Sequence, residues 1–249
     1  MEQHTHADLF TRILGPPPCA GAPAVVLVHG LGLSGRYFRP LARRLAASGA
    51  TVLVPDLPGN ARSRTTMRRM PDVVQTADAL ADWHRRLVPR PSMLVANSVG
   101  CQVAAALVAR HANLIHRLVL LGPALTPGAS AWRQSGQLLA DALREPPSLL
   151  KVAAADYLST GPLRFAASFR HAVQDADEAF EGHLARVGVP TLVVRGANDT
   201  IASEAWTRRV ARLVTDGRTT EVPDAAHAAH YSAPDAVARL IQTFAEETS

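Results

Sequence analysis

Short apolar runs, rich in β-branched residues, alternate along this chain with longer amphipathic stretches, and no other feature constrains the fold as strongly. A strand-sized run followed by a helix-sized one, repeated several times, is typical of a mostly parallel sheet covered by helices. The runs that we expect to form strands are Leu9–Leu14, Ala24–His29, Thr51–Pro55, Ser92–Asn97, Arg117–Leu121, Pro190–Arg195 and Arg218–Val222. The stretches that we expect to form helices are Tyr37–Ala47, Pro71–Leu87, Val99–His111, Glu204–Val214 and Pro234–Glu246. The sequence therefore predicts an α/β fold.

The alternation stops between Pro123 and Arg186, where helical patterns follow one another without a convincing strand. We interpret residues 123–186 as a helical cap, inserted into a core made of residues 1–122 and 187–249. Four aromatic side chains of this segment are candidates for lining a substrate pocket, although they can equally bury one another. They are Trp132, Tyr157, Phe165 and Phe169.

The length of the chain, 249 residues, is within what a single hydrophobic core can organise. Its longest apolar runs are strand-sized and fall short of the roughly 18 residues of a membrane span. Residues Met1–Phe10 carry acidic and histidine side chains where a signal peptide has a basic start and an apolar run. We therefore expect a cytoplasmic protein with no membrane partner.

The net charge of +5 comes from arginines scattered along the chain, and Lys151 is the only lysine. A nucleic-acid-binding surface usually gathers its basic residues in a stripe or motif, often with aromatic residues between them. This chain has no such motif, so we expect no nucleic-acid partner.

The segment Ala96-Asn97-Ser98-Val99-Gly100 follows an apolar strand and leads into a predicted helix. It differs from the pattern G-x-S-x-G only in its first small residue. A serine in such a turn exposes its hydroxyl at the carboxyl end of a strand, and the neighbours two positions away are small because strand and helix crowd there. Ser98 is therefore a candidate nucleophile, although a serine at the start of a helix commonly acts as its N-cap.

A serine hydroxyl needs a base to remove its proton, and a third group to orient that base. Two later segments supply such residues. Asp199 follows the strand that ends at Arg195, and His227 follows the strand that ends at Val222. We expect both at the carboxyl edge of the sheet, and His230 is the nearest alternative base.

These segments together resemble the α/β-hydrolase superfamily, specifically its branch of small capped serine esterases and C–C hydrolases. The matching pieces span nearly all of the chain outside residues 123–186, and they occur in the family's order of serine, aspartate and histidine. They are His29-Gly30-Leu31-Gly32, Asp56-Leu57-Pro58-Gly59-Asn60-Ala61-Arg62-Ser63, the serine turn, Gly196–Asp199 and Ala226–Pro234. The departures from the family pattern are Ala61, Ala96 and Ala226 in place of glycine, and Asn60 in place of histidine. None of them removes a reacting group.

The resemblance implies a role for each candidate residue. Ser98 would be the nucleophile, His227 the general base and acid, and Asp199 the residue that orients the imidazole. The backbone N–H groups of Leu31 and Val99 would form the oxyanion hole. We expect no cofactor and no metal.

The expected reaction is hydrolysis of a small to medium carboxylic ester, thioester or lactone through an acyl-enzyme, so the expected partner is a small acyl compound. Two alternatives stay open. A C–C bond hydrolase of vinylogous diketones would use the same machinery, and a protein that binds a small molecule without turnover could share the fold.

Overall fold

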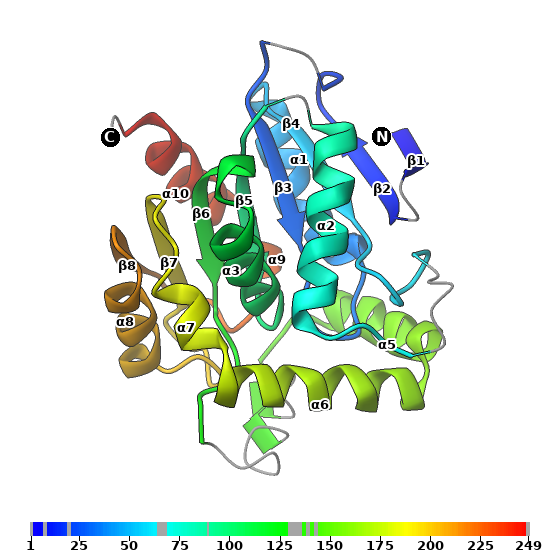
Figure 1. Cartoon of the computed structure of the whole chain (residues 1–249), viewed down its shortest axis with the longest axis vertical. Helices are drawn as coiled ribbons and strands as arrows, with labels where there is room; N and C mark the ends of the chain where they lie inside the picture. The colour runs from blue at the N-terminus through cyan, green and yellow to red at the C-terminus, as the bar shows by residue number, and fades with distance from the viewer. Residues whose placement is uncertain are drawn as a thin grey trace.

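The structure, a computed structural model, describes residues 2–6, 9–18, 21–63, 69–88, 90–128, 136–137, 140–141 and 144–247, and of residues 2–6 only the backbone. In these residues eight strands form one sheet, in the order β1-β2-β4-β3-β5-β6-β7-β8 (Figure 1). The strands are β1 (Glu2–His6), β2 (Leu9–Leu14), β3 (Ala24–Val28), β4 (Thr51–Pro55), β5 (Ser92–Asn97), β6 (Ile115–Leu121), β7 (Thr191–Gly196) and β8 (Gly217–Val222). All the predicted strands are confirmed with small differences at their ends, and β1 is an addition.

The sheet is parallel from β4 to β8, while β2 runs antiparallel to both β1 and β4. In the centre of the sheet Val25 of β3 lies between Val52 of β4 and Met93 of β5. The central strands β4 and β5 are buried along their whole length because both of their faces are covered. The carboxyl ends of β3, β5, β6, β7 and β8 therefore meet at one edge, and this is where ligands bind in such sheets.

Two layers of helices cover the sheet, and each forms its own hydrophobic core with one face. The helices α2 (Val73–Leu87), α3 (Gly100–Arg110) and α8 (Glu204–Leu213) contribute to one core, and α1 (Arg39–Ala47) and α10 (Pro234–Glu246) to the other (Figure 1). All five predicted helices are confirmed. The start of α1 differs, since Gly35–Phe38 forms a short 3₁₀ turn, η1, before it.

Local signals fix the helix starts. The side chain of Asp72 accepts a hydrogen bond from the backbone N–H of Gln75, whose own side chain accepts one from the N–H of Asp72, so α2 begins with a capping box. Ser203 caps α8 in the same way by accepting from the N–H of Trp206. Proline at the first helical position opens α10 at Pro234.

The segment 123–186, which we call the cap segment, forms helices but no strand in the residues that the structure describes. These helices are α5 (Pro147–Thr160), α6 (Pro162–Glu178) and α7 (Phe180–Leu184), and α5 and α6 lie across the carboxyl edge of the sheet (Figure 1). Gly161 joins α5 and α6 with a φ of +78°, a conformation that glycine adopts without strain. Phe180 and Leu184 of α7 pack into the core on the α3 side.

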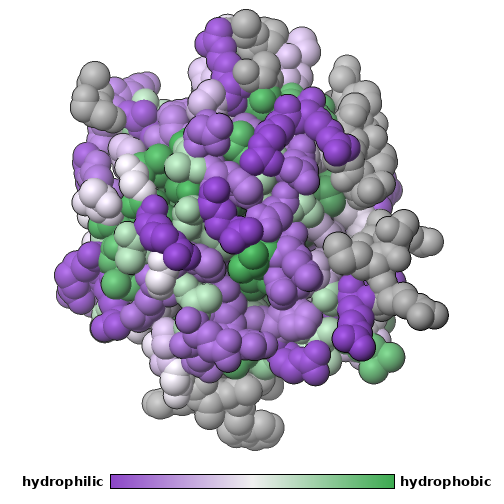
Figure 2. All heavy atoms as spheres, viewed as in Figure 1, coloured by the Kyte–Doolittle hydropathy of each residue, from purple (hydrophilic) through white to green (hydrophobic). Residues whose placement is uncertain are grey.

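Hydrophilic residues cover most of the face viewed in Figure 2, and smaller hydrophobic areas lie between them. Some large apolar side chains of the cap segment are exposed, among them Leu158 and Leu163. Among the described residues, no helix combines the length and the apolar character that crossing a membrane requires.

Candidate active site

Ser98 lies on a sharp turn between β5 and α3. Its φ is +58°, a left-handed conformation that costs a non-glycine residue about 1 kcal/mol or more. The turn is also crowded, because a Cβ atom added at Gly100 would lie 2.7 Å from the carbonyl oxygen of His29. The side chain of Ser98 makes no capping hydrogen bond to α3, whose N-cap is Val99. The turn is therefore strained in the way that a nucleophile turn is, and the alternative role of Ser98 as an N-cap is wrong.

His227 and Asp199 lie together at the carboxyl ends of β8 and β7. The Nδ1 atom of His227 is 2.9 Å from Oδ2 of Asp199. The other oxygen of Asp199 accepts hydrogen bonds from the N–H groups of Ile201 (2.8 Å) and Ala202 (2.9 Å), which fixes the carboxylate. The Nε2 atom of His227 is buried and has no hydrogen-bond partner among the described residues.

Gly122, directly after β6, allows this pair to form. A Cβ atom at this position would lie 2.9 Å from Oδ2 of Asp199 and 3.0 Å from Nδ1 of His227, and the residue has a φ of +50°. The preceding residue, Leu121, accepts a hydrogen bond of 3.0 Å from the N–H of Ser98. The serine turn and the histidine–aspartate pair are thus held against the same end of β6.

The pKa values of the pair move in opposite directions. Burial disfavours the charged form of His227, but the charge and hydrogen bond of Asp199, together with the charges of Asp141 and Glu145, outweigh it and raise the pKa of His227 to about 9. Burial raises the pKa of Asp199, but His227 and the two backbone N–H groups outweigh it and lower that pKa overall. The aspartate therefore stays ionised and stabilises a protonated imidazole.

His230 is placed differently from His227. It is fully buried, and its ring lies 4.2 Å from that of Tyr37 and 4.4 Å from that of Phe38, measured between centroids. Burial, followed by the charge of His227, lowers the pKa of His230 well below its ordinary value. It is His227 that contacts Asp199, so His230 has the environment of a core histidine.

The loop after β3 approaches the serine turn from the other side. A Cβ atom at Gly30 would lie 3.0 Å from Cβ of Ser98. Nε2 of His29 accepts a hydrogen bond of 2.8 Å from the N–H of Leu57, so its Nδ1 carries the proton and donates to the carbonyl of Gly30 at 2.9 Å. Burial lowers the pKa of His29 and keeps it neutral. The imidazole thus fixes the loop that carries Leu31.

Ser98 lines a narrow cavity whose water-accessible volume is about 20 Å³. Both predicted oxyanion residues line it, and so does one cap aromatic. The lining residues are Leu31, Ser98, Val99, Ala124, Leu125, Thr126, Gln137, Phe169 and Ile201. Most of the wall is apolar, which suits an apolar acyl or alkyl group.

The four cap aromatics have different surroundings. Phe169 lines the cavity at Ser98. Tyr157 and Phe165 pack edge to face at 5.2 Å, and both contact the position of Gly32 in the loop after β3. Trp132 lies outside the residues that the structure describes.

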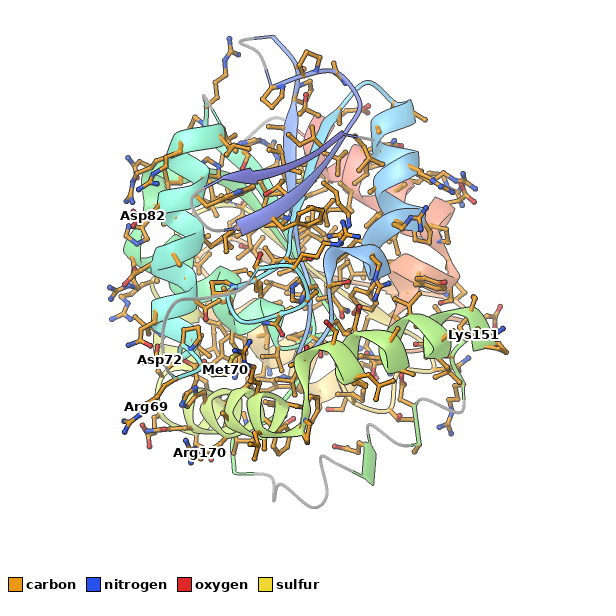
Figure 3. The ribbon with its side chains drawn as sticks, turned by 90° about the vertical axis from the view of Figure 1, so that its right-hand side faces the viewer. Arg69, Met70, Asp72, Asp82, Lys151 and Arg170 are labelled. Carbon is orange, nitrogen blue, oxygen red and sulfur yellow. The ribbon has the colours of Figure 1, made fainter. Side chains whose placement is uncertain are left out.

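A second narrow cavity, with a water-accessible volume of about 50 Å³, lies on the β4 side of Leu31 and Val99. It is lined by Asn60, by Met70 before α2 and by His171 of α6. Figure 3 shows Met70 and Asp72 above the helix that carries Arg170, which is α6. The cap segment and the sheet edge therefore enclose space on both sides of the predicted oxyanion loop.

Sequence reasoning missed two carboxylates of the cap segment that reach the site. Oε1 of Glu145 accepts a hydrogen bond of 2.6 Å from the N–H of Ala228, directly after His227. Oδ1 of Asp141 accepts one of 3.3 Å from the hydroxyl of Thr200, directly after Asp199. Asp141 is helical and Glu145 lies in a bend after it, and no sequence pattern pointed from either of them to the site.

Asn97, the residue before Ser98, was also missed as a link within the site. Its side chain accepts a hydrogen bond from the hydroxyl of Tyr37 and donates one of 3.0 Å to the carbonyl of Leu121. It also approaches the carbonyl of His227 at 3.5 Å. Asn97 thereby ties the strand that ends at the serine to the loop that carries the histidine.

A sequence model of the alpha/beta hydrolase family matches residues 25–240 of the chain. The chain belongs to the alpha/beta hydrolase family. This hydrolase is similar to a pimeloyl-[acyl-carrier protein] methyl ester esterase of Aromatoleum aromaticum, with 28% identity over 88% of this chain and 97% of that protein. It also matches the esterase of that name from Chromobacterium violaceum (35% identity over 46% of this chain) and the magnesium-chelatase 30 kDa subunit of Rhodobacter capsulatus (36% over 34%). These two matches span only 40% and 30% of the relatives' own lengths.

Solved structures agree on the fold. The enol-lactonase of Burkholderia xenovorans LB400 has a TM-score of 0.77 at 22% identity, with 99% of this hydrolase and all of that chain covered. A thermophilic esterase of Thermogutta terrifontis has a TM-score of 0.76, also at 22% identity, and covers 95% of this chain and 93% of its own. At this identity the likeness supports the α/β-hydrolase fold.

Proposed function

We propose that this protein is a serine esterase that hydrolyses small to medium carboxylic esters, thioesters or lactones through an acyl-enzyme on Ser98. The observation that carries the proposal is the contact of 2.9 Å between His227 Nδ1 and Asp199 Oδ2 beside the strained turn of Ser98. An imidazole held in this way has its Nε2 available to take a proton, which is what a serine nucleophile requires.

The mechanism follows from these atoms. Nε2 of His227 takes the proton of the Ser98 hydroxyl while Oγ attacks the carbonyl carbon of the substrate. The carbonyl oxygen gains a negative charge, which the backbone N–H groups of Leu31 and Val99 stabilise. The imidazolium then donates its proton to the leaving alkoxide or thiolate, and water releases the acid by the same steps in reverse order.

We further propose that residues 123–186 act as a cap over the site and select the substrate. The helices α5 and α6 lie across the sheet edge, and Phe169 of α6 lines the cavity at Ser98. Because the wall of this cavity is largely apolar, an ester with an apolar acyl group is the substrate class that its chemistry suits. Two relatives bear the name of a methyl ester esterase, which supports ester hydrolysis.

Turnover assays on two substrate classes test the proposal. The purified protein is assayed with p-nitrophenyl esters of increasing acyl length and with a ring-fission dienone, the substrate of a C–C hydrolase. We expect ester turnover that Ser98→Ala abolishes and that Ser159→Ala, a change of an exposed serine on α5, leaves intact. Turnover of the dienone alone would overturn the ester class, and binding of esters without turnover would overturn the enzymatic role.

A further inference from the structure

Three polar residues of the cap segment, each four positions from the next, touch three parts of the site. Gln137 lines the cavity at Ser98. Asp141 contacts Thr200, next to Asp199, through the hydroxyl and through the backbone N–H at 3.5 Å. Glu145 accepts the hydrogen bond of 2.6 Å from Ala228, next to His227. One stretch of the cap segment therefore reaches the site through three polar side chains.

The two carboxylates of this stretch are buried. Asp141 is 3% exposed and Glu145 is 9% exposed, and Oε2 of Glu145 has no hydrogen-bond partner in the described part of the chain. A buried carboxylate that is only partly hydrogen-bonded costs free energy. Among the described residues, no arginine or lysine forms an ion pair with Asp141 or Glu145. The charge that compensates them is that of His227 when it is protonated.

We propose that Asp141 and Glu145 are positioning residues, which fasten the cap segment to the loops of Asp199 and His227 and stabilise the positive charge that His227 gains during proton transfer. This inference rests on the proposed function. It gives His227 three carboxylates instead of the single one of a serine triad, and two of them come from the cap segment. The position of the cap segment and the pKa of His227 are then coupled.

The titratable groups around His227 determine in which direction its pKa moves when a cap carboxylate is removed. Asp199 faces it from the loop after β7, Asp141 and Glu145 from the cap segment, and His230 from α9 (Ala229–Ser232). His230 is neutral, because burial lowers its pKa, so it adds no charge. Burial raises the pKa of Glu145 to about 7, so it is ionised in the alkaline range where His227 titrates. Removing either cap carboxylate should therefore lower the pKa of His227.

The test uses substitutions that remove charge but preserve shape. Glu145→Gln retains an oxygen that can accept the hydrogen bond from Ala228, and Asp141→Asn retains one for Thr200. Glu178→Gln, a change of an exposed carboxylate on α6, is the matched control. In the pH profile of kcat/KM for a p-nitrophenyl ester, the rise of the rate on the acid side reports the apparent pKa of His227. We expect each of the first two variants to lower this apparent pKa by about one pH unit. The control should leave the apparent pKa unchanged, and KM should change little in all three variants.

A second readout separates this inference from the proposed function. The imidazole of His227 is titrated by NMR in the wild type and in each variant, which requires no turnover. A lower titration midpoint in Glu145→Gln and Asp141→Asn, but not in Glu178→Gln, supports the inference even if no ester is hydrolysed. Equal midpoints in all four proteins overturn it, even if the wild type is an active esterase. Thermal denaturation checks the folding of each variant, and either cap variant alone suffices for the comparison.

Discussion

Asp199 and His227 lie on short loops whose backbone is fixed by the sheet, whereas Asp141 and Glu145 reach the same place from the cap segment. The sheet loops are held by close approaches, such as that of Gly122 to the His227–Asp199 pair. The part of the cap segment that carries Asp141 and Glu145 contacts those loops through side-chain hydrogen bonds. In the proposed mechanism the sheet edge supplies the reacting groups, and we expect the cap segment to adjust the pKa of His227 and to select the substrate. Changes at the edge should therefore abolish activity, and changes in the cap should tune it.

The largest effect is expected at the reacting atoms of the sheet edge. Ser98→Ala and His227→Ala should each lower kcat for a p-nitrophenyl ester by at least about 10³-fold, because neither proton transfer nor acyl-enzyme formation can then occur. His230→Ala should keep the larger share of activity, measured in protein shown by circular dichroism to be folded. If Ser98→Ala kept more than about a tenth of the wild-type rate, Ser98 would not be the nucleophile.

A smaller loss is expected when the histidine–aspartate pair is displaced but retained. Gly122→Ala would place a methyl group 2.9 Å from Oδ2 of Asp199 and 3.0 Å from Nδ1 of His227. A displacement of about 1 Å in such a site lowers the rate by about 10²-fold, which kcat/KM measures directly. Gly128→Ala is the matched control, since Gly128 also has a positive φ (+73°) but no atom lies within 4 Å of the added carbon. Equal kcat/KM of the two variants would show that activity does not depend on the exact position of the His227–Asp199 pair.

The pH dependence of kcat/KM tests how strongly the surrounding carboxylates, two of them from the cap segment, raise the pKa of His227. A base must be neutral, and the pKa of His227 is raised from 6.5 to about 9. We therefore expect kcat/KM to rise about tenfold per pH unit up to about pH 9 and then to level off. The rate is measured from pH 6 to 10, with Ser98→Ala as the blank for spontaneous hydrolysis. A plateau that begins near pH 7 would mean that Asp199, Asp141 and Glu145 together do not raise the pKa of His227.

The smallest effect is expected from the aromatic residue of the cap that lines the cavity at Ser98. Phe169→Ala should enlarge this cavity and shift the preferred acyl chain toward longer esters, by about fourfold in kcat/KM per added methylene, or about 0.8 kcal/mol. Leu163→Ala, an exposed change on the same helix, is the control. If both variants rank short, medium and long esters as the wild type does, substrate selection does not lie at Phe169.

The parts of the molecule that were predictable from the sequence are those with local causes. The strands and helices follow from hydrophobic periodicity, and the positions of Ser98, Asp199 and His227 follow from where their strands end. The cap contacts depend on packing between distant parts of the chain, since Glu145 and Ala228 are 83 residues apart and Asp141 and Thr200 are 59 apart. No short sequence motif predicts such a contact. For the same reason, the pKa of His227 could not be predicted from the histidine alone, because the cap carboxylates help to raise it.

The most direct test of the serine mechanism is to find which residue a fluorophosphonate modifies. The probe reacts with a serine whose hydroxyl is activated by a base, and peptide mapping by mass spectrometry identifies the modified residue. We predict modification of Ser98 alone, none in Ser98→Ala, and a rate lowered by at least about 10²-fold in His227→Ala. Modification of a different serine, or none in a protein that still hydrolyses esters, would contradict the account.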